Sequence, residues 1–379
     1  MVRVALVISN LEFGGTQRQL VELVNASQQL GVHYFIVSMS EATPLARQLS
    51  DPDVVRIVHK RSRFDLSVVP RMARLLRNLE VDIAHGFLFD AEIAVRLAGR
   101  IAGTSAVIGS ERNANYRIKK IQRLAYFLTH GMRDACVANS RAGAVFNARQ
   151  LGYHSDHYRV VYNGVDTDRF HPLDRDTACE HLGLDTGYRW IGMVGSFKRR
   201  KNHSVFLKAA RRVLDENPDV AIALAGDTLA GGLHGTDEYK REVMEEIESL
   251  DFGRRIKLVG NLEDIENFYA ACDLTVLPSL HEGTPNVALE SMACGTPVVA
   301  SDVADNSIVI PHGDAGFIVP VNDVDAMADA MSRMLNKDVL STMRVHARTR
   351  AIEQFGTTAF ARAMLDVYED VLRKAAEAA

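Results

Sequence analysis

Short apolar runs rich in β-branched residues alternate with longer amphipathic stretches along most of the chain. Seven runs in the first half predict strands: Val2–Ser9, Tyr34–Ser38, Val54–Val58, Asp82–His85, Ala106–Gly109, Ala135–Asn139 and Val160–Tyr162. Six runs in the second half do the same: Trp190–Val194, Ala221–Ala225, Ile256–Val259, Leu274–Leu277, Val298–Ser301 and Gly316–Val319. Because these runs are apolar on both faces, we expect parallel sheets that helices cover on both sides.

Helical periodicity fills the intervals between these runs. Nine stretches carry it: Gln17–Leu30, Val68–Leu79, Ala91–Ile101, Ile118–Thr129, Ala142–Leu151, Val205–Glu216, Asp237–Ser249, Asn286–Cys294 and Ala326–Leu335. Such a repeated strand–helix alternation predicts an α/β protein with doubly wound sheets. The glycine-containing stretch 229–236 is expected to form a loop.

The length of 379 residues indicates two domains at ~100–200 residues each. The division is expected near 163–190, where the turn signal Asn-Gly-Val-Asp precedes a polar stretch. We predict Rossmann-like domains over 1–168 and 169–357, and a last helix, 358–379, that returns to the first domain. Two such sheets that face each other leave a cleft at the carboxyl ends of their strands, where ligands bind.

Composition and charge exclude several classes of protein. Hydrophobic residues make up 47% and charged residues 24% of the chain, as in soluble globular proteins, and a net charge of -4 argues against a nucleic-acid binder. No segment approaches the ~20 apolar residues of a membrane span, and Val2–Ile8 is too short for a signal peptide. The cysteines form no Cys-x-x-Cys pair and fit a reducing cytoplasm: Cys136, Cys179, Cys272 and Cys294.

The most informative segment is HEGTPNVALESMACGTPVVAS, residues 281–301. It predicts a loop and then a helix, with Thr284 as N-cap and Pro285 as first helical residue. The amides of Asn286 and Val287 are then expected to point out of the helix end. Together with the helix dipole, which contributes roughly half a positive charge, they would seat a diphosphate.

Two carboxylates flank this expected phosphate seat, with seven residues between them. Glu290, inside the helix, could accept hydrogen bonds from vicinal hydroxyls such as those of a ribose. Glu282, in the loop, would lie beside a sugar attached to the diphosphate. Taken alone, Glu282 and Glu290 are each also compatible with an ordinary solvated acid. The surrounding sequence pattern favours a functional role for both.

Here the chain resembles the retaining glycosyltransferases of family 4, which have the GT-B fold of two Rossmann-like domains facing across a cleft. The Glu–seven residues–Glu element is the most specific part of the resemblance. Other segments that resemble the family are Gly14-Gly15, NGVDTDRF (163–170), VGSFKRRKNH (194–203) and YAACDLTVLPS (269–279).

The basic loop after the first strand of the second domain is expected at the same sheet edge as the phosphate seat. Fixed cations there stabilise a departing diphosphate more than the bound donor. By resemblance Lys201 matches the family's lysine. Many members carry an arginine where this chain has Ser196, and Arg200 is the substitute we assign. For Lys198 and Arg199 a solvated turn is preferred, and neither Lys198 nor Lys201 is expected in a core.

Three further positions in the first domain are candidates. His85 ends a predicted strand and is expected to project into the cleft; in the family a histidine near this strand end contacts donor sugar or acceptor, and a buried structural histidine is the alternative. Glu111 and Arg112 end the next strand region and could bind acceptor hydroxyls or an acidic acceptor group. Gly15 lets the backbone approach a ligand, with a tight strand–helix turn as the alternative.

The stretch Ile118–Thr129 predicts a basic amphipathic helix. Its apolar face holds Ile118, Ile121, Leu124, Ala125 and Leu128. Such a helix can lie on an anionic membrane, or it can be an ordinary surface helix packed on its sheet, which we prefer.

We therefore predict a cytoplasmic, metal-independent, retaining glycosyltransferase, with peripheral contact at the inner face of the membrane left open. It would move a sugar from a nucleotide diphosphate donor (a UDP- or GDP-sugar) to a saccharide or lipid-linked acceptor, in bacterial cell-surface polysaccharide or glycolipid synthesis. No cofactor, no metal and no nucleic acid are expected. The alternatives are a nucleotide-sugar epimerase or glycogen-type synthase on the same fold, or an inactive nucleotide-sugar-binding protein.

The predicted site falls into three groups of residues. The catalytic group is Glu282, Lys201, Arg200 and His85. The donor-binding group is Gly15, Gly283, Thr284, Asn286, Val287 and Glu290. The acceptor-binding group is Glu111 and Arg112.

Overall fold

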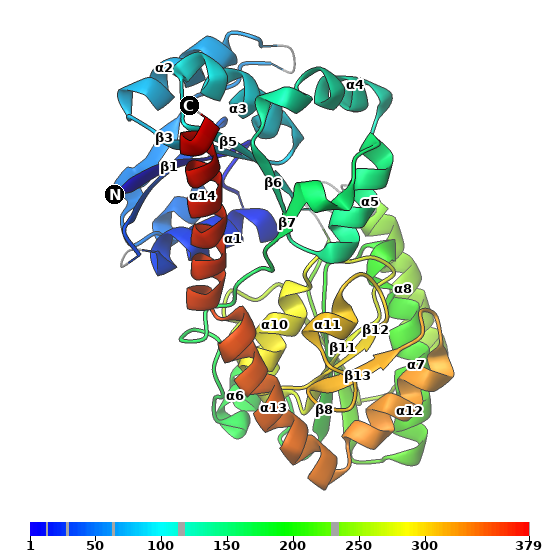
Figure 1. Cartoon of the computed structure of the whole chain (residues 1–379). Coiled ribbons are helices and arrows are strands. Elements are labelled where there is room, and N and C mark those ends of the chain that lie inside the picture. The colour runs from blue at the N-terminus through cyan, green and yellow to red at the C-terminus, as the bar shows by residue number, and fades with distance from the viewer. Residues whose placement is uncertain (13, 28–29, 63–64, 113–117, 229–234, 379) are drawn as a thin grey trace. The chain divides into compact units, whose positions relative to one another are not determined.

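The computed structural model describes residues 1–12, 14–27, 30–62, 65–112, 118–228 and 235–378. The chain forms two compact units (Figure 1). The first unit comprises Met1–Gly164 and Thr357–Ala379, and the second comprises Val165–Gly356. The divisions thus follow Gly164 and Gly356, where the sequence predicts them after residues 168 and 357. Most of the expected loop at 229–236 lies outside the described residues.

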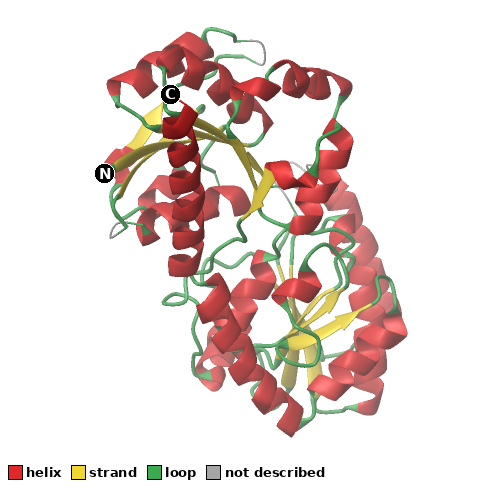
Figure 2. Cartoon of the chain, viewed as in Figure 1, coloured by secondary structure: helices red, strands yellow, loops and turns green. Residues whose placement is uncertain are grey.

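The first unit contains a parallel sheet of seven strands in the order β3-β2-β1-β4-β5-β6-β7, between layers of helices (Figure 2). Its strands are β1 Val2–Ile8, β2 Val32–Ser38, β3 Val55–Ile57, β4 Ile83–Phe87, β5 Ala106–Glu111, β6 Ala135–Ala138 and β7 Tyr158–Val160. Its α-helices are α1 Gly15–Ala26, α2 Val68–Asn78, α3 Phe89–Ala102, α4 Lys120–Leu128, α5 Arg141–Leu151 and α14 Thr357–Ala378. Its short 3-10 helices are η1 Pro44–Gln48, η2 Pro52–Val54, η3 His130–Met132 and η4 Ser155–His157.

The second unit contains a parallel sheet of six strands in the order β10-β9-β8-β11-β12-β13. Its strands are β8 Arg189–Val194, β9 Val220–Ala225, β10 Ile256–Gly260, β11 Leu274–Leu277, β12 Val298–Ser301 and β13 Gly316–Val319. Its α-helices are α6 Arg175–Leu182, α7 His203–Glu216, α8 Thr236–Leu250, α9 Ile265–Ala271, α10 Asn286–Ala293, α11 Asn306–Val309, α12 Val324–Met334 and α13 Lys337–Phe355, and η5 Arg199–Lys201 is a 3-10 turn.

Both sheets are doubly wound, as the sequence predicts. In each unit the chain starts on a central strand, runs outward to one edge, and returns to the other side of the first strand. The strand order therefore reverses between β1 and β4, and again between β8 and β11. The carboxyl ends of the strands beside such a reversal are where open α/β sheets bind ligands.

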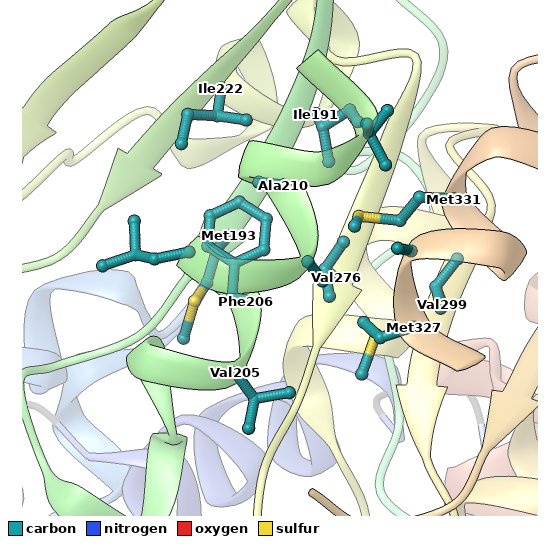
Figure 3. Close-up of a cluster of buried hydrophobic side chains, with 14 of the residues drawn as sticks. Ile191, Met193, Val205, Phe206, Ala210, Ile222, Val276, Val299, Met327 and Met331 are labelled. Carbon is teal, nitrogen blue, oxygen red and sulfur yellow. The ribbon is translucent and has the colours of Figure 1, made fainter. Parts of the chain in front are cut away.

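A dense apolar core fixes these strand ends in the second unit (Figure 3). Phe206 of α7 is fully buried against the sheet, close to Met193 and Val276, and Met327 and Met331 of α12 complete the layer. Each large apolar side chain of this kind contributes about 1.5–3 kcal/mol when it is buried. The loops at the carboxyl edge thus extend from a rigid base.

In the first unit the last helix completes the core. The buried face of α14 repeats at helical spacing and carries Phe360, Ala361, Met364, Val367, Tyr368 and Val371. This face packs on α1 and on the sheet, and Tyr368 is fully buried beside Tyr34. The carboxyl-terminal residues are therefore an integral part of the first unit.

Candidate active site

Two loops leave the second sheet on either side of its reversal point. The loop after β8 spans residues 195–202, and the loop after β11 spans 278–285. Gly226, at the end of β9, keeps the first loop close to the sheet. Its φ is +125°, and a Cβ at this position would lie 2.3 Å from the Gly195 carbonyl oxygen, so only glycine fits.

Lys201 and Glu282 meet between these two loops. Lys201 donates a hydrogen bond of 2.6 Å from Nζ to Glu282 Oε1, and each residue is only 8% exposed. Burial by itself would raise the pKa of the Glu282 carboxyl. The charges of Lys201 and Arg200 and the hydrogen bond outweigh it and lower that pKa, so the carboxylate is ionised at neutral pH.

The burial of Lys201 corrects the expectation that this side chain lies outside a core. The turn η5 brings its aliphatic stem against Gly195, where a Cβ would lie 3.3 Å from Lys201 Cγ. The stem of a lysine can be buried at low cost when its ammonium is paired. The charge pattern of the loop does not predict this burial, because Glu282, the partner of Lys201, lies 81 residues away in the sequence.

Arg200 covers the exposed side of the pair. Its Nη1 lies 3.6 Å from Glu282 Oε2 and donates a long hydrogen bond of 3.4 Å to the His281 carbonyl oxygen. The backbones of the two loops are also joined, since the Leu280 amide donates to the Arg200 carbonyl at 2.8 Å. Two cations and one anion are therefore preorganised at one sheet edge, with a net positive charge that suits a phosphate group.

The other cations of this loop are placed differently. Arg199 forms a bidentate ion pair with Glu242 of α8, with Nη1 and Nη2 at 2.7 and 2.5 Å from the two carboxylate oxygens. Lys198 is half-buried, and burial lowers its pKa. Arg199 is thus held in a surface ion pair, as the solvated-turn interpretation predicts.

The helix α10 begins in the loop after β11, as the sequence predicts, but one residue later. Pro285 is its N-cap, with ψ of 93°, and accepts a hydrogen bond of 2.9 Å from the Ala288 amide. The assignment of Thr284 as N-cap is therefore wrong, because the extended Pro285 separates it from the helix. Asn286 and Val287 remain the first two helical residues, at the positive end of the helix dipole.

Glu290 lies in the second turn of α10 and is half-buried. Its Oε2 accepts a hydrogen bond of 2.7 Å from the hydroxyl group of Tyr269, which is fully buried in α9. Tyr269 begins the YAACDLTVLPS segment, and the sequence pattern alone gives this residue no role. The hydroxyl fixes one side of the carboxylate, and a contact between Glu290 and a ribose stays a prediction.

Two residues at the end of the basic loop hold it in place, and neither is among the predicted site residues. Asn202 adopts φ of +58°, and its amide group donates to the Pro278 carbonyl at 3.1 Å and to Asn322 Oδ1 at 2.9 Å. His203 stacks on Phe197 with 4.8 Å between ring centroids, and burial lowers its pKa to about 4. The sequence signal for these two residues is the Asn-His pair at the end of the VGSFKRRKNH segment.

His85 does not end its strand, and that expectation is wrong. The strand β4 continues to Phe87, and the fully buried ring of His85 lies 2.9 Å from both the Tyr368 and the Ser110 hydroxyl groups. Burial, followed by the charge of Arg112, lowers its pKa, so the ring is neutral. This geometry gives no support to a catalytic contact, which stays a prediction.

Glu111 and Arg112 line a pocket of about 150 Å³ at the carboxyl ends of β4 and β5. In the described part of the chain, Glu111 Oε1 and Arg112 Nε and Nη2 are buried without a hydrogen-bond partner. Burial and the charge of Glu92 raise the pKa of Glu111 to about 8, and burial lowers that of Arg112 to about 10. At neutral pH the pocket therefore presents a protonated carboxyl group and a guanidinium with unused donors.

A buried ion pair between Glu92 and Arg96 supports this pocket. The Tyr126 hydroxyl group of α4 donates to Glu92 Oε2 at 3.1 Å, which ties the pocket wall to α3. A Cβ at Gly109 would lie 2.2 Å from Glu92 Oε1, so the glycine in β5 makes room for the carboxylate. Gly15, the remaining candidate of the first unit, is the exposed first residue of α1.

Comparison with known families matches both units. Residues 188–337 match the family described as Glycosyl transferases group 1, and residues 13–169 match the family described as Glycosyltransferase Family 4. The chain belongs to glycosyltransferase family 4. The resemblance that its motifs predict is thereby confirmed.

Two similar proteins are named as a galactosyltransferase and a mannosyltransferase. The chain is 26% identical over 320 residues to the UDP-Gal:alpha-D-GlcNAc-diphosphoundecaprenol alpha-1,3-galactosyltransferase of Escherichia coli. The aligned residues cover 81% of this chain and 80% of that enzyme. It is 31% identical over 244 residues to the lipopolysaccharide core biosynthesis mannosyltransferase LpsB of Rhizobium meliloti (strain 1021), covering 63% of this chain and 66% of that protein.

Solved structures show that the family 4 chain has the GT-B fold. The Anabaena protein Alr3699/HepE in complex with UDP superposes with a TM-score of 0.85 at 19% identity, over 97% of this chain and 100% of that one. WaaG, a glycosyltransferase involved in lipopolysaccharide biosynthesis, superposes with a TM-score of 0.68 at 15% identity, over 97% of this chain and 99% of that one. At these identities the likeness concerns the fold.

No three His, Cys, Asp or Glu side chains in the described ranges are grouped as metal ligands would be. None of the helices described is both long and apolar enough to cross a bilayer.

Proposed function

We propose that this family 4 chain transfers a hexosyl group from a nucleoside-diphosphate sugar to an acceptor hydroxyl, with retention of configuration, in bacterial cell-surface polysaccharide or glycolipid synthesis. The observation that carries the proposal is the buried ion pair of Lys201 and Glu282. The pair lies at the point where the strand order of the second sheet reverses, and Glu282 belongs to the loop that leads into α10. The site lies in the cytoplasm, where nucleotide sugars are made.

The donor binds to the second unit. Its diphosphate lies at the start of α10, against the backbone of Gly283 to Val287, with Arg200 and Lys201 as counter-charges. Glu290 holds the ribose, and the Tyr269 hydroxyl group fixes the Glu290 carboxylate. The nucleotide is a uridine diphosphate; support comes from the titles of the structural neighbours, which include UDP and UDP-glucose complexes of Alr3699/HepE.

The chemistry follows from the charges in this site. An ammonium has three donors, and Glu282 uses one of those of Lys201, so the others can reach the diphosphate. As the bond between the sugar C1 and the phosphate oxygen breaks, negative charge grows on the diphosphate, and Lys201 and Arg200 stabilise it. The acceptor oxygen bonds to C1 on the same face, and its proton passes to the departing phosphate oxygen. No metal ion is required, because these two cations carry the compensating charge.

The acceptor binds to the first unit, in the pocket of Glu111 and Arg112. The unpartnered guanidinium donors suit an anionic group, and the protonated Glu111 can donate to an acceptor oxygen. The acceptor is a saccharide or a lipid-linked saccharide. The E. coli relative supports this assignment, because its name specifies a diphosphoundecaprenol-linked acceptor.

A nucleotide panel followed by product analysis tests the proposal. UDP at about 100 times its dissociation constant should stabilise the protein by ~2.7 kcal/mol in thermal unfolding. Incubation with UDP-hexoses should release UDP, by transfer or by slow hydrolysis. An isomerised UDP-sugar without UDP release would identify an epimerase, and binding without any conversion would identify an inactive binding protein.

A further inference from the structure

The loop between β13 and α12 carries a residue that reaches the basic loop. Asn322 follows the end of β13 by three residues, and β11 and β12 lie between β13 and β8 in the sheet. The amide group of Asn202 nevertheless donates a hydrogen bond of 2.9 Å to Asn322 Oδ1. A third strand-end loop is therefore attached to the candidate active site, besides the loops after β8 and β11.

Packing between two helices brings this third loop to the site. The helix α12 begins directly after the loop and packs on α7. Met327 and Met331 of α12 lie in the same buried cluster as Phe206 of α7 (Figure 3). Asn202 stands just before α7 and Asn322 just before α12, so a shared apolar core fixes the two asparagines near each other.

The amide group of Asn202 joins all three loops. Its nitrogen carries two hydrogens, so it can donate both to the Pro278 carbonyl, at 3.1 Å, and to Asn322 Oδ1. Lys201 directly precedes Asn202, and Glu282 follows Pro278 by four residues in the same loop. The two hydrogen bonds therefore act on the same gap between loops that the ion pair of Lys201 and Glu282 spans.

Both asparagines have a left-handed backbone. The angle φ is +58° at Asn202 and +62° at Asn322, a region that asparagine enters at lower cost than most residues with a Cβ. Residues in this region persist where the surrounding structure fixes them, and they cluster at functional sites. Glycine adopts the same backbone without strain but has no amide side chain. A glycine variant therefore isolates what the side chain contributes.

The basic loop needs such an attachment because its charges repel one another. Lys198, Arg199, Arg200 and Lys201 are consecutive, and the turn η5 that holds the last three is only three residues long. Lys201 is buried, so water screens its repulsion from Arg200 only weakly. Accuracy matters here, since a displacement of about 1 Å at a reacting site can cost ~100-fold in rate.

We propose that Asn202 and Asn322 are positioning residues of the transfer reaction, an inference that rests on the proposed function. Their hydrogen bond holds the backbone of Lys201 beside the loop of Glu282, so that the ammonium meets the departing diphosphate at bonding distance. Both asparagines act through Lys201, and neither bonds to the donor.

Turnover of UDP-hexose at saturating donor tests the proposal. Asn202→Gly keeps the backbone conformation and removes both hydrogen bonds, so kcat should fall about 10-fold. Calorimetric UDP affinity should change by less than about threefold, because the seat at the start of α10 is unaltered. Asn322→Gly removes one bond and should lower kcat roughly threefold, whereas Asn322→Asp keeps the accepting oxygen and should stay within about twofold of the parent.

The matched control lies at the other end of α7. The amide group of Asn217 donates to the Val213 carbonyl at 2.8 Å, and Asn217→Ala, which removes this bond, should turn over like the parent. In a Lys201→Ala background, Asn202→Gly should lower kcat by less than about twofold more, because no ammonium is left to position. A loss of about 10-fold in both backgrounds would show that Asn202 does not act through Lys201, and would overturn the proposal.

Unfolding in denaturant tests the two asparagines without relying on the proposed function. The coupling between Lys201 and Glu282, measured from Lys201→Ala, Glu282→Gln and the double variant, should fall by at least about half when Asn202→Gly is added. A parent protein that releases no UDP from UDP-hexoses refutes the proposed function, and this coupling then still decides the role of Asn202. An unchanged coupling, or an Asn202→Gly protein that turns over like the parent, overturns the positioning role.

Discussion

Lys201 and Glu282, 81 residues apart in the sequence, form a buried ion pair with 2.6 Å between Nζ and Oε1. The pair lies at the point where the strand order of the second sheet reverses. Neither strand-end loop forms a site by itself. The doubly wound topology places their starting strands, β8 and β11, side by side, and this pairing makes the site.

The pair should be energetically coupled in the folded protein. Lys201→Ala leaves the buried Glu282 carboxylate with only the more distant Arg200, and breaking a buried pair in this way costs about 3–5 kcal/mol. Adding Glu282→Gln should recover part of that loss, because the uncompensated charge is gone. Denaturant unfolding of the two single variants and the double variant measures this coupling; additive losses would mean that the two side chains do not interact.

The two glutamates should act differently. Glu290→Gln should chiefly weaken UDP binding, because its proposed contact is the ribose. Glu282→Gln should chiefly lower turnover, because its proposed contact is the sugar and it orients Lys201. Calorimetric UDP affinity beside kcat at saturating donor separates the two effects, and the assignment fails if both variants bind UDP and turn over like the parent.

Glu111 should make the protein less stable as pH rises. Its pKa is raised to about 8 in the folded state, so the folded protein holds a proton that the unfolded chain releases nearer pH 4.5. Stability is therefore lost between about pH 5 and pH 8, by something of the order of 3 kcal/mol. Thermal unfolding across this range should show a flatter pH dependence for Glu111→Gln; the same slope as the parent would show that Glu111 is ionised throughout.

Transfer should persist in excess EDTA. Arg200 and Lys201 supply the positive charge that a metal ion provides in other enzymes that act on nucleotide phosphates. Rates measured with and without EDTA should agree within a factor of about two. Complete loss of activity that magnesium or manganese restores would show that a metal ion belongs to the site.

Much of the fold was predictable because its signals are local. All 13 strands were expected, since each is a short apolar run between helical patterns; β2 and β7 begin two residues earlier than predicted. The long helix α13 was missed because its buried side chains form a narrow stripe in an otherwise polar sequence: Met343, Ala347, Ala351 and Phe355. Four apolar residues at four-residue spacing in a helix of 19 residues give little amphipathic contrast.

The site was predictable in its residue types and less so in its environments. Glu282, Lys201 and the start of α10 could be found from motif and strand ends. The burial of Lys201, the Tyr269 partner of Glu290 and the enclosure of His85 depend on contacts distant in sequence, which no local pattern contains. The preference for an α4 helix packed on its sheet fails for a similar reason: Ile121, Leu124 and Leu128 are exposed, since periodicity identifies a face but not the direction in which it points.

The most direct test of the whole account compares Lys201→Ala with Lys198→Ala in UDP-hexose turnover at saturating donor. Lys201 should stabilise the diphosphate more as the sugar–phosphate bond breaks, so its removal should lower kcat by roughly 100-fold or more. Lys198 is a neighbouring, half-exposed cation without an assigned role, and its removal should change kcat by less than about threefold. A folded Lys201→Ala protein that turns over like the parent, or a critical Lys198 beside a dispensable Lys201, would contradict the account.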